Sequence, residues 1–307
     1  MSKDAFIFPG QGSQYPGMGK ELAGNFRIAA DTFAEADDAL GFALSKICFE
    51  GPEADLRLTV NTQPAILAVS IAILRVIQTE SPVTPSYLAG HSLGEYSALV
   101  AAGSLGFADA LRTVRARGGF MQEAVPVGVG SMAAILGVEP DILGEICCEA
   151  ADGEVVAPAN FNSPGQIVIA GNTTAVSRAV EIAKMRGFRK AMLLPVSAPF
   201  HCSLMIPAGE RLAGVLEGLR INPLRIPVVT NVEALPNLEK DRVKELLVRQ
   251  VSAPVLWEAS VVRMVRDGVE RFVEVGPGKV LTGLVKRISK DVETYNVEDI
   301  GTLKALL

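Results

Sequence analysis

The pentapeptide Gly90-His91-Ser92-Leu93-Gly94 is the feature that most constrains the fold. The strand-like run YLAG precedes its serine, and the helix-like run GEYSALVAAG follows it. A G-x-S-x-G motif between a strand and a helix is typical of a sharp turn that exposes the serine and leaves room only for small residues two positions away. The sequence therefore predicts an α/β protein with this strand, turn and helix.

Two interpretations of Ser92 follow from the motif. In the first, its hydroxyl is a nucleophile at a helix N-terminus, where free N–H groups and the helix dipole favour an oxyanion. The main-chain N–H of Leu93 is then the natural first donor. In the second, Ser92 only caps the helix. The motif alone leaves both interpretations open.

A nucleophilic serine needs a base, and the chain has only two histidines. His91 is next to Ser92, and successive side chains in such a turn point apart, so we expect His91 to pack or cap. His201 follows a predicted strand and precedes a predicted helix, where it can enter a cleft between two domains. By elimination, His201 is the candidate base.

An acid that orients the histidine is not evident. The acidic residues between the serine and His201 include Asp109, Glu123, Asp141 and Asp152. Most of them fall in predicted helices or in a predicted inserted subdomain. A backbone carbonyl or an amide is the alternative orienting group.

The remaining elements of the body alternate between strands and helices. Ala5 to Phe8 form a short apolar run before a glycine-rich loop. Asn61 and Thr62 before Pro64 predict the start and the cap of a helix. Its apolar part, residues 64–74, is about half as long as a membrane span requires, so we expect a buried core helix.

Residues 127–196 show a different rhythm of short segments. Their predicted order, βαββαβ, is that of a ferredoxin-like unit. We therefore expect this subdomain to be inserted into a body made of residues 1–126 and 197–307. The later elements are predicted as a helix over 203–219, a strand over 226–230, helices over 240–250 and 258–267, a strand over 271–276 and a last helix from about residue 279.

Composition excludes several classes of function. With a net charge of −5 and no long basic run, nucleic acid is not expected as a partner. The four cysteines, Cys48, Cys147, Cys148 and Cys202, have no C-x-x-C spacing, and two histidines do not suffice for an ordinary zinc site. The apolar run at the start is too short for a signal peptide. We expect reduced thiols, a cytoplasmic location, and neither a metal nor a membrane.

Eight ordered motifs resemble those of the malonyl-CoA:acyl-carrier-protein transacylase family of bacterial type II fatty-acid synthesis. They are FPGQGSQYPGMG, NTQPA, GHSLGEYSAL, RARGGFMQ, NFNSPGQIVIAG, PFHCSLM, LVRQ and EVGPGKVLTG. The resemblance covers nearly the whole chain. It implies an α/β-hydrolase-like body with a ferredoxin-like insertion, malonyl-CoA and acyl carrier protein as partners, no cofactor, and a monomer.

The resemblance also implies roles for individual residues. Ser92 matches the nucleophile and His201 its base. Main-chain N–H groups of Gln11 and Leu93 match the oxyanion hole. The main-chain carbonyl of Gln250 matches the group that orients the histidine.

Two further residues match the substrate-binding positions of the family. Asn160 matches a position that lines the active site, although an asparagine beside a turn is as often structural. Arg117 matches the arginine that binds the malonyl carboxylate. A planar guanidinium suits this role, because it binds a carboxylate through two parallel hydrogen bonds. Phe200 resembles the malonyl-type version of its position. The basic residues that are candidates for docking the acidic carrier are Arg189, Lys190, Lys286, Arg287 and Lys290.

Three alternatives remain. A serine esterase or thioesterase of α/β-hydrolase type would pass the acyl group mainly to water. An extender-unit acyltransferase of polyketide synthesis would use the same chemistry. A CoA- or carrier-binding protein with a spent site is disfavoured, because the residues of the site are all present.

Overall fold

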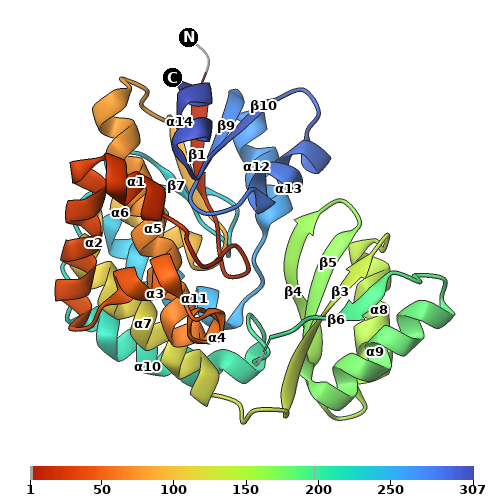
Figure 1. The fold of residues 1–307 in the computed structure, drawn as a ribbon. Coiled ribbons are helices and arrows are strands. Elements are labelled where there is room, and N and C mark those ends of the chain that lie inside the picture. The colour runs from red at the N-terminus through yellow and green to blue at the C-terminus, as the bar shows by residue number, and fades with distance from the viewer. Residues whose placement is uncertain (1–2, 197) are drawn as a thin grey trace.

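The computed structural model describes residues 3–196 and 198–307. Residues 1, 2 and 197 lie outside the described part, and two of the predicted domain bounds, 1 and 197, fall on them. Within it, the chain is a mixed α/β protein with two separate sheets, each covered by its own helices (Figure 1).

The larger sheet has six strands in the order β10-β9-β1-β2-β7-β8. They are β1 (Lys3–Phe8), β2 (Tyr87–Gly90), β7 (Val228–Val229), β8 (Pro236–Asn237), β9 (Val269–Val275) and β10 (Glu293–Val297). All pair in parallel except β8, which is antiparallel to β7. Phe6 and Phe8 of β1 contribute to one apolar cluster, and Ala5 and Ile7 to another. Alternate residues therefore face the two sides of the sheet, and both sides are buried.

Helices cover both faces of this sheet. The cluster around Phe6 and Phe8 includes residues of α2, α5 and α7, and the cluster around Ala5 and Ile7 includes residues of α12 and α13. The helices of the body are α1 (Lys20–Asn25), α2 (Arg27–Leu40), α3 (Leu44–Glu50), α4 (Glu53–Arg57), α5 (Thr59–Glu80), α6 (Gly94–Ala101), α7 (Phe107–Glu123), α10 (Ile206–Glu217), α11 (Val243–Ser252), α12 (Trp257–Arg266), α13 (Val280–Ile288) and α14 (Ile300–Leu306).

Helix α5 begins earlier than predicted. Asn61, Thr62 and Pro64 all lie inside it, so the predicted cap is wrong. The Thr62 hydroxyl instead donates to two carbonyl oxygens of the preceding turn. By length and composition α5 is the one helix in the described chain that could cross a membrane, but 83% of its apolar window is buried. The prediction of a buried core helix is confirmed.

The smaller sheet belongs to residues 127–196. Its elements are β3 (Gly130–Leu136), α8 (Pro140–Ala151), β4 (Val156–Ser163), β5 (Gln166–Asn172), α9 (Thr173–Met185) and β6 (Ala191–Leu193), and its strand order is β4-β5-β3-β6. Every pairing in it is antiparallel. Strand β6 is short, because only three of its residues pair with β3.

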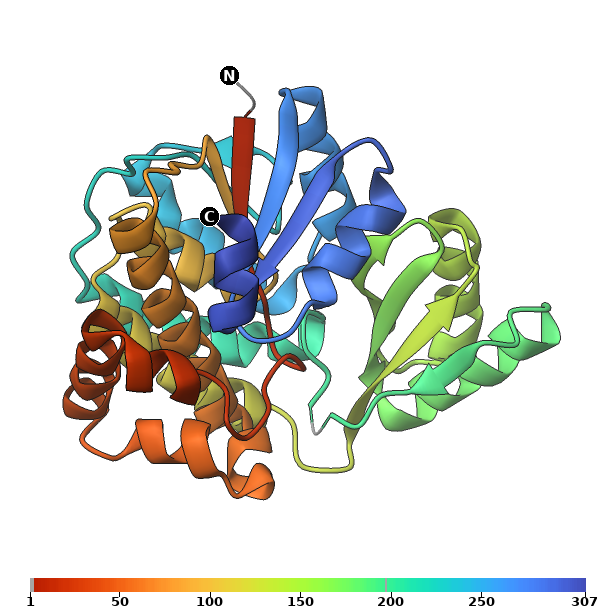
Figure 2. The same ribbon diagram turned by 45° about the horizontal axis from the view of Figure 1, so that its top comes forward.

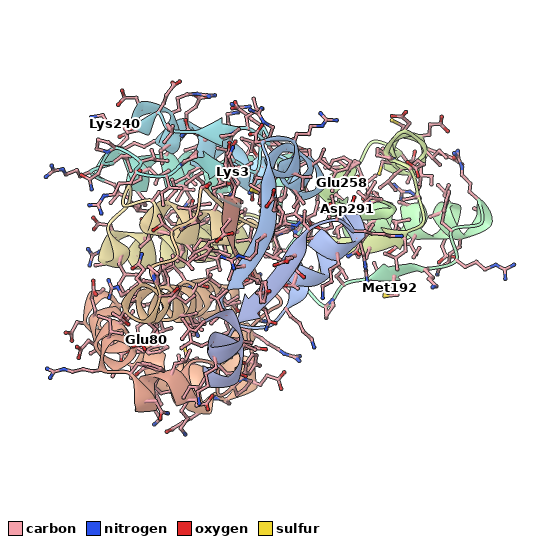
Figure 3. All side chains as sticks on the ribbon, turned by 90° about the horizontal axis from the view of Figure 1, so that it is seen from above. Lys3, Glu80, Met192, Lys240, Glu258 and Asp291 are labelled. Atoms are coloured by element: carbon pink, nitrogen blue, oxygen red, sulfur yellow. The ribbon has the colours of Figure 1, made fainter. Side chains whose placement is uncertain are left out.

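The two faces of the smaller sheet have different neighbours. Ala133 and Ile135 pack with α8 and α9, whereas Met132 and Val168 belong to the apolar cluster of the body. Figure 2 shows α8 and α9 on the side of the sheet away from the body. Figure 3 shows the unit projecting sideways, with the exposed Met192 on it.

Strand β4 joins the two units. The Phe161 N–H donates to the Val255 carbonyl, and the Val255 N–H donates to the Ala159 carbonyl, both over 2.9 Å. These bonds hold the smaller sheet beside the segment between α11 and α12.

The prediction that a helix from about residue 279 is the last element is wrong. Helix α13 is followed by β10 and α14. Strand β10 lies at the edge of the larger sheet and is mostly only half-buried, so its sequence lacks the continuous apolar run that marks an inner strand.

Candidate active site

The candidate site lies where β1 and β2 end. Phe8 of β1 pairs with Gly90 of β2, so the loop that contains Gln11 and the turn that contains Ser92 leave the sheet side by side. In parallel sheets, ligands bind at the carboxyl ends of the strands. A pocket of about 210 Å³ is lined there by both segments and by His201.

Close backbone packing explains the glycines of the motif. A Cβ on Gly90 would lie 1.9 Å from the carbonyl carbon of Gly94, and a Cβ on Gly94 would lie 2.0 Å from the carbonyl oxygen of Phe8. Ser92 itself has a φ of 51°, in the left-handed region that few residues other than glycine adopt. Such strain at a half-buried serine that lines a pocket is typical of a functional turn.

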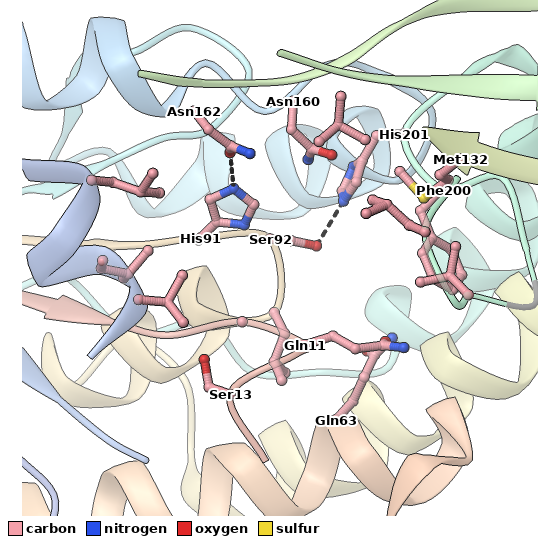
Figure 4. Close-up of a pocket in the computed structure, with 18 of the residues that line it drawn as sticks. Gln11, Ser13, Gln63, His91, Ser92, Met132, Asn160, Asn162, Phe200 and His201 are labelled. Atoms are coloured by element: carbon pink, nitrogen blue, oxygen red, sulfur yellow. Dashed lines mark hydrogen bonds between the residues drawn. The ribbon is translucent and has the colours of Figure 1, made fainter. Parts of the chain in front are cut away.

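Ser92 and His201 are in direct contact. Ser92 Oγ lies 2.7 Å from His201 Nε2, as Figure 4 shows, and His201 Nδ1 lies 2.8 Å from the main-chain oxygen of Gln250. A carbonyl oxygen only accepts, so Nδ1 carries the hydrogen and Nε2 accepts from the serine hydroxyl. Burial and the nearby charge of Arg117 lower the pKa of His201 to about 3. The imidazole is therefore neutral and able to take a proton at neutral pH.

His91 points elsewhere. Its Nε2 lies 2.8 Å from Asn162 Oδ1 on β4 (Figure 4). Its ring also lies near the ring of Trp257. Burial lowers the pKa of His91, so this ring is also neutral. His91 packs against the smaller sheet, in agreement with the expectation that it does not reach the serine.

Arg117 is buried beside the serine and is 1% exposed. Its guanidinium donates to Gln63 Oε1 over 2.8 Å, to Gln250 Oε1 over 2.9 Å and to Ser92 Oγ over 3.0 Å. Among the described residues it has no carboxylate within ion-pair distance, and its Nε has no partner. A buried arginine keeps its charge, so the site offers a positive fork to an anion.

The two N–H groups expected to bind an oxyanion are free in the described part of the chain. Neither the Leu93 nor the Gln11 main-chain N–H donates a hydrogen bond there. Both residues line the pocket with Ser92. Gly10 brings the loop close, because a Cβ on it would lie 2.5 Å from the His91 carbonyl oxygen.

Asn160 lies on β4 in the pocket wall and is 7% exposed. Met121, Met132, Val168 and Phe200 line the pocket as well, so the wall around the polar groups is largely apolar. Such a lining with a few convergent polar groups is typical of a substrate site.

Sequence reasoning missed four polar residues of this site: Gln63, Glu95, Asn162 and Asn231. Gln63, Glu95 and Asn162 stand inside the motifs given above, so their positions carried a signal that was not used. Asn231 follows a two-residue strand and shows no local pattern. In the described chain no three His, Cys, Asp or Glu side chains are grouped to hold a metal ion.

Comparisons with known proteins agree on one family. The acyl transferase domain model matches residues 5–305. The malonyl CoA-acyl carrier protein transacylase of Escherichia coli (strain K12) is 51% identical over 307 residues, which cover 100% of this chain and 99% of that protein. The protein of the same name from Bacillus subtilis (strain 168) is 50% identical over 305 residues, 99% of this chain and 96% of that protein.

Solved structures agree with this result. An acyl carrier protein S-malonyltransferase from Vibrio cholerae has a TM-score of 0.97 and 49% identity, and the match covers 100% of both chains. A malonyl-transacylase in complex with its holo type II PKS acyl-carrier protein has a TM-score of 0.97 and 47% identity, over 100% of this chain and 99% of that one.

Proposed function

Because the chain belongs to the acyl transferase family, in which its full-length relatives are malonyl CoA-acyl carrier protein transacylases, we propose how its residues carry out that activity. The protein transfers a malonyl group from malonyl-CoA to the phosphopantetheine thiol of acyl carrier protein and so supplies fatty-acid elongation. The observation that carries the site assignment is the buried Arg117 guanidinium, 3.0 Å from Ser92 Oγ and without a carboxylate partner in the described chain.

In the first half-reaction Ser92 becomes acylated. His201 Nε2 takes the hydroxyl proton while Oγ attacks the thioester carbonyl of malonyl-CoA. The N–H groups of Gln11 and Leu93 hold the resulting oxyanion. The C–S bond then breaks, and His201 returns the proton to the departing CoA sulfur.

The second half-reaction runs the same steps in reverse. His201 takes the proton of the carrier thiol, and the sulfur attacks the malonyl-serine ester. The bond to Ser92 Oγ breaks, and His201 reprotonates the serine. Named protein groups carry out each proton transfer and stabilise each developing charge. We therefore propose that the reaction needs no cofactor.

Arg117 selects the acyl group. Its fork binds the free malonyl carboxylate with charge-assisted hydrogen bonds, for which acetyl has no counterpart. An esterase that passes acyl groups to water has no need of a buried arginine at this position. Asn160 supports the acyl chain from the wall of the pocket.

We also propose that the body, residues 1–126 and 197–307, is α/β-hydrolase-like and that residues 127–196 are a ferredoxin-like insertion. The parallel strands with a serine turn after β2 support the first assignment. The element order β3-α8-β4-β5-α9-β6 and the antiparallel sheet support the second.

The carrier docks at the mouth of the pocket in this proposal. Arg287 is exposed and bonds to Gln166, which lines the pocket, so it stands at the rim. Lys286, Lys290, Arg189 and Lys190 are exposed as well. Because the carrier protein of this family is acidic, these cations can steer it. One relative is solved in complex with its type II PKS acyl-carrier protein, so a polyketide carrier is the second candidate acceptor.

Intact-protein mass spectrometry tests the function. The protein is mixed briefly with malonyl-CoA or acetyl-CoA, and holo acyl carrier protein is then added. We expect a malonyl adduct on Ser92 that moves to the carrier, and little adduct from acetyl-CoA. Equal loading of both acyl groups, with loss to water instead of transfer, would show a hydrolase.

A further inference from the structure

Glu95 is a buried carboxylate directly behind the serine turn. It lies in the first turn of α6 and is 2% exposed. Its Oε2 accepts from Gln250 Nε2 over 2.8 Å and from the Asn231 N–H over 3.1 Å. Burying a carboxylate costs free energy even when it is hydrogen-bonded. Packing alone therefore does not explain why a carboxylate lies here.

Both partners of Glu95 hold the main chain of Ser92. Asn231 Oδ1 accepts from the Ser92 N–H over 2.7 Å, and Gln250 Nε2 donates to the Ser92 carbonyl over 2.9 Å. Glu95 thus braces, through the main-chain N–H and side chain of Asn231 and the side chain of Gln250, the residue that adopts the strained φ of 51°. The loss of its acceptor would release both braces.

Glu95 is also connected to Arg117. Arg117 donates to Gln250 Oε1 over 2.9 Å, and the same amide donates to Glu95 Oε2 through Nε2. One amide group therefore separates the carboxylate from the guanidinium. The charges attract each other, yet Glu95 does not occupy the fork of Arg117.

We propose that Glu95 is a positioning residue that braces Ser92 through Gln250 and Asn231 and serves as the countercharge of Arg117 across the Gln250 amide. A direct ion pair would compete with the substrate carboxylate for the guanidinium. A countercharge one amide away offsets the buried positive charge and leaves the fork open. This inference rests on the proposed malonyl specificity.

Two substitutions separate the roles. Glu95→Gln keeps an acceptor oxygen but removes the charge, whereas Glu95→Leu removes both at similar volume. Asp4→Asn is the matched control, since Asp4 is a buried carboxylate paired with Arg271 at the opposite end of β1. Burial raises the pKa of Glu95 to about 7, so kinetics are measured at pH 8.5, where the carboxylate is ionised.

Malonyl and acetyl loading of Ser92 and malonyl transfer to the carrier are measured for each protein. In Glu95→Gln we expect kcat to stay within about threefold of wild type and the ratio of malonyl to acetyl loading to rise about tenfold, the factor that corresponds to one pKa unit of interaction. In Glu95→Leu we expect kcat to fall about a hundredfold, as for a small displacement of reacting groups. Asp4→Asn should match wild type in both measurements.

Three results would overturn the inference. The countercharge role fails if Glu95→Gln leaves the malonyl-to-acetyl ratio unchanged, because a merely structural role moves both rates together. The bracing role fails if Glu95→Leu keeps the wild-type kcat, or if Glu95→Gln loses as much kcat as Glu95→Leu. If Glu95→Leu does not fold, a fall in the kcat of Glu95→Gln beyond the expected range overturns the bracing role instead. Failure of wild type to transfer malonyl to the carrier would instead reject the proposed function.

Discussion

His201 Nδ1 lies 2.8 Å from the main-chain carbonyl oxygen of Gln250. This acceptor is neutral and belongs to the backbone of α11, so its position depends on the helix and not on a side chain. A carboxylate in the same place would stabilise the imidazolium by charge. Here the imidazole of His201 is oriented without a negative partner, and the positive Arg117 is close. The arrangement therefore favours the neutral imidazole.

The titration of the two histidines tests this consequence. Burial lowers the pKa of His91 as well as that of His201. We expect the Cε1–H chemical shifts of both rings to stay at their neutral values from pH 8 to pH 5 in the folded protein. Nuclear magnetic resonance measures them, and a His91→Gln variant assigns the two signals. A His201 signal with a midpoint near 6.5 would contradict the proposed environment.

Replacement of Arg117 should change selectivity more than folding. In Arg117→Ala we expect malonyl loading of Ser92 to fall about ten- to a hundredfold relative to acetyl loading, since a charged hydrogen bond contributes roughly 1.5–3 kcal/mol. The same mass-spectrometric assay measures both rates. Arg112→Ala is the control, because Arg112 is an exposed arginine of the same helix paired with Asp109. An unchanged ratio in Arg117→Ala would remove the carboxylate assignment.

The glycines of the serine turn should not tolerate a side chain. In Gly90→Ala the added Cβ would lie 1.9 Å from a backbone atom, so we expect a loss of several kcal/mol or no folded protein. Gly119→Ala is the matched control in α7, where a Cβ has no atom within 4 Å. It should stabilise the chain by about 0.5–1 kcal/mol. Thermal unfolding followed by circular dichroism compares the two.

Local patterns predicted the serine turn because its constraints are local. Gly90 and Gly94 restrict the backbone within five residues, so the motif carries the geometry with it. The order of strands and helices along residues 127–196 was also accessible, since short strands and helices alternate regularly there. The start of α5 could not be predicted in this way, because the Thr62 hydroxyl bonds to the preceding turn instead of capping the helix.

Local sequence patterns could not predict the hydrogen bonds that hold the main chain of Ser92, because their partners are far away in the sequence. Asn231 contacts the Ser92 N–H across 139 positions of sequence, and Gln250 reaches the Ser92 carbonyl across 158. A main-chain carbonyl that orients a histidine leaves no residue type to recognise, so only family resemblance pointed to Gln250. Strand β10 was missed because a half-buried edge strand has a weak apolar pattern.

An ionised Glu95 costs the folded protein free energy, because its carboxylate is buried. Burial raises its pKa from the ordinary 4.5 to about 7, so the folded state holds the proton more tightly than the unfolded state does. The stability that this group contributes is fully present below pH 4.5 and is lost as the pH rises through 7. Glu95→Gln does not titrate, so we expect it to exceed wild type in free energy of unfolding by on the order of 2 kcal/mol at pH 8, with the difference shrinking toward pH 4.5.

Asp4→Asn should instead be less stable than wild type at pH 8, because it breaks the pair with Arg271. Urea denaturation at several pH values measures both differences. A Glu95→Gln protein less stable than wild type at pH 8 would mean that the ionised carboxylate stabilises the fold, and its retention would then need no functional explanation.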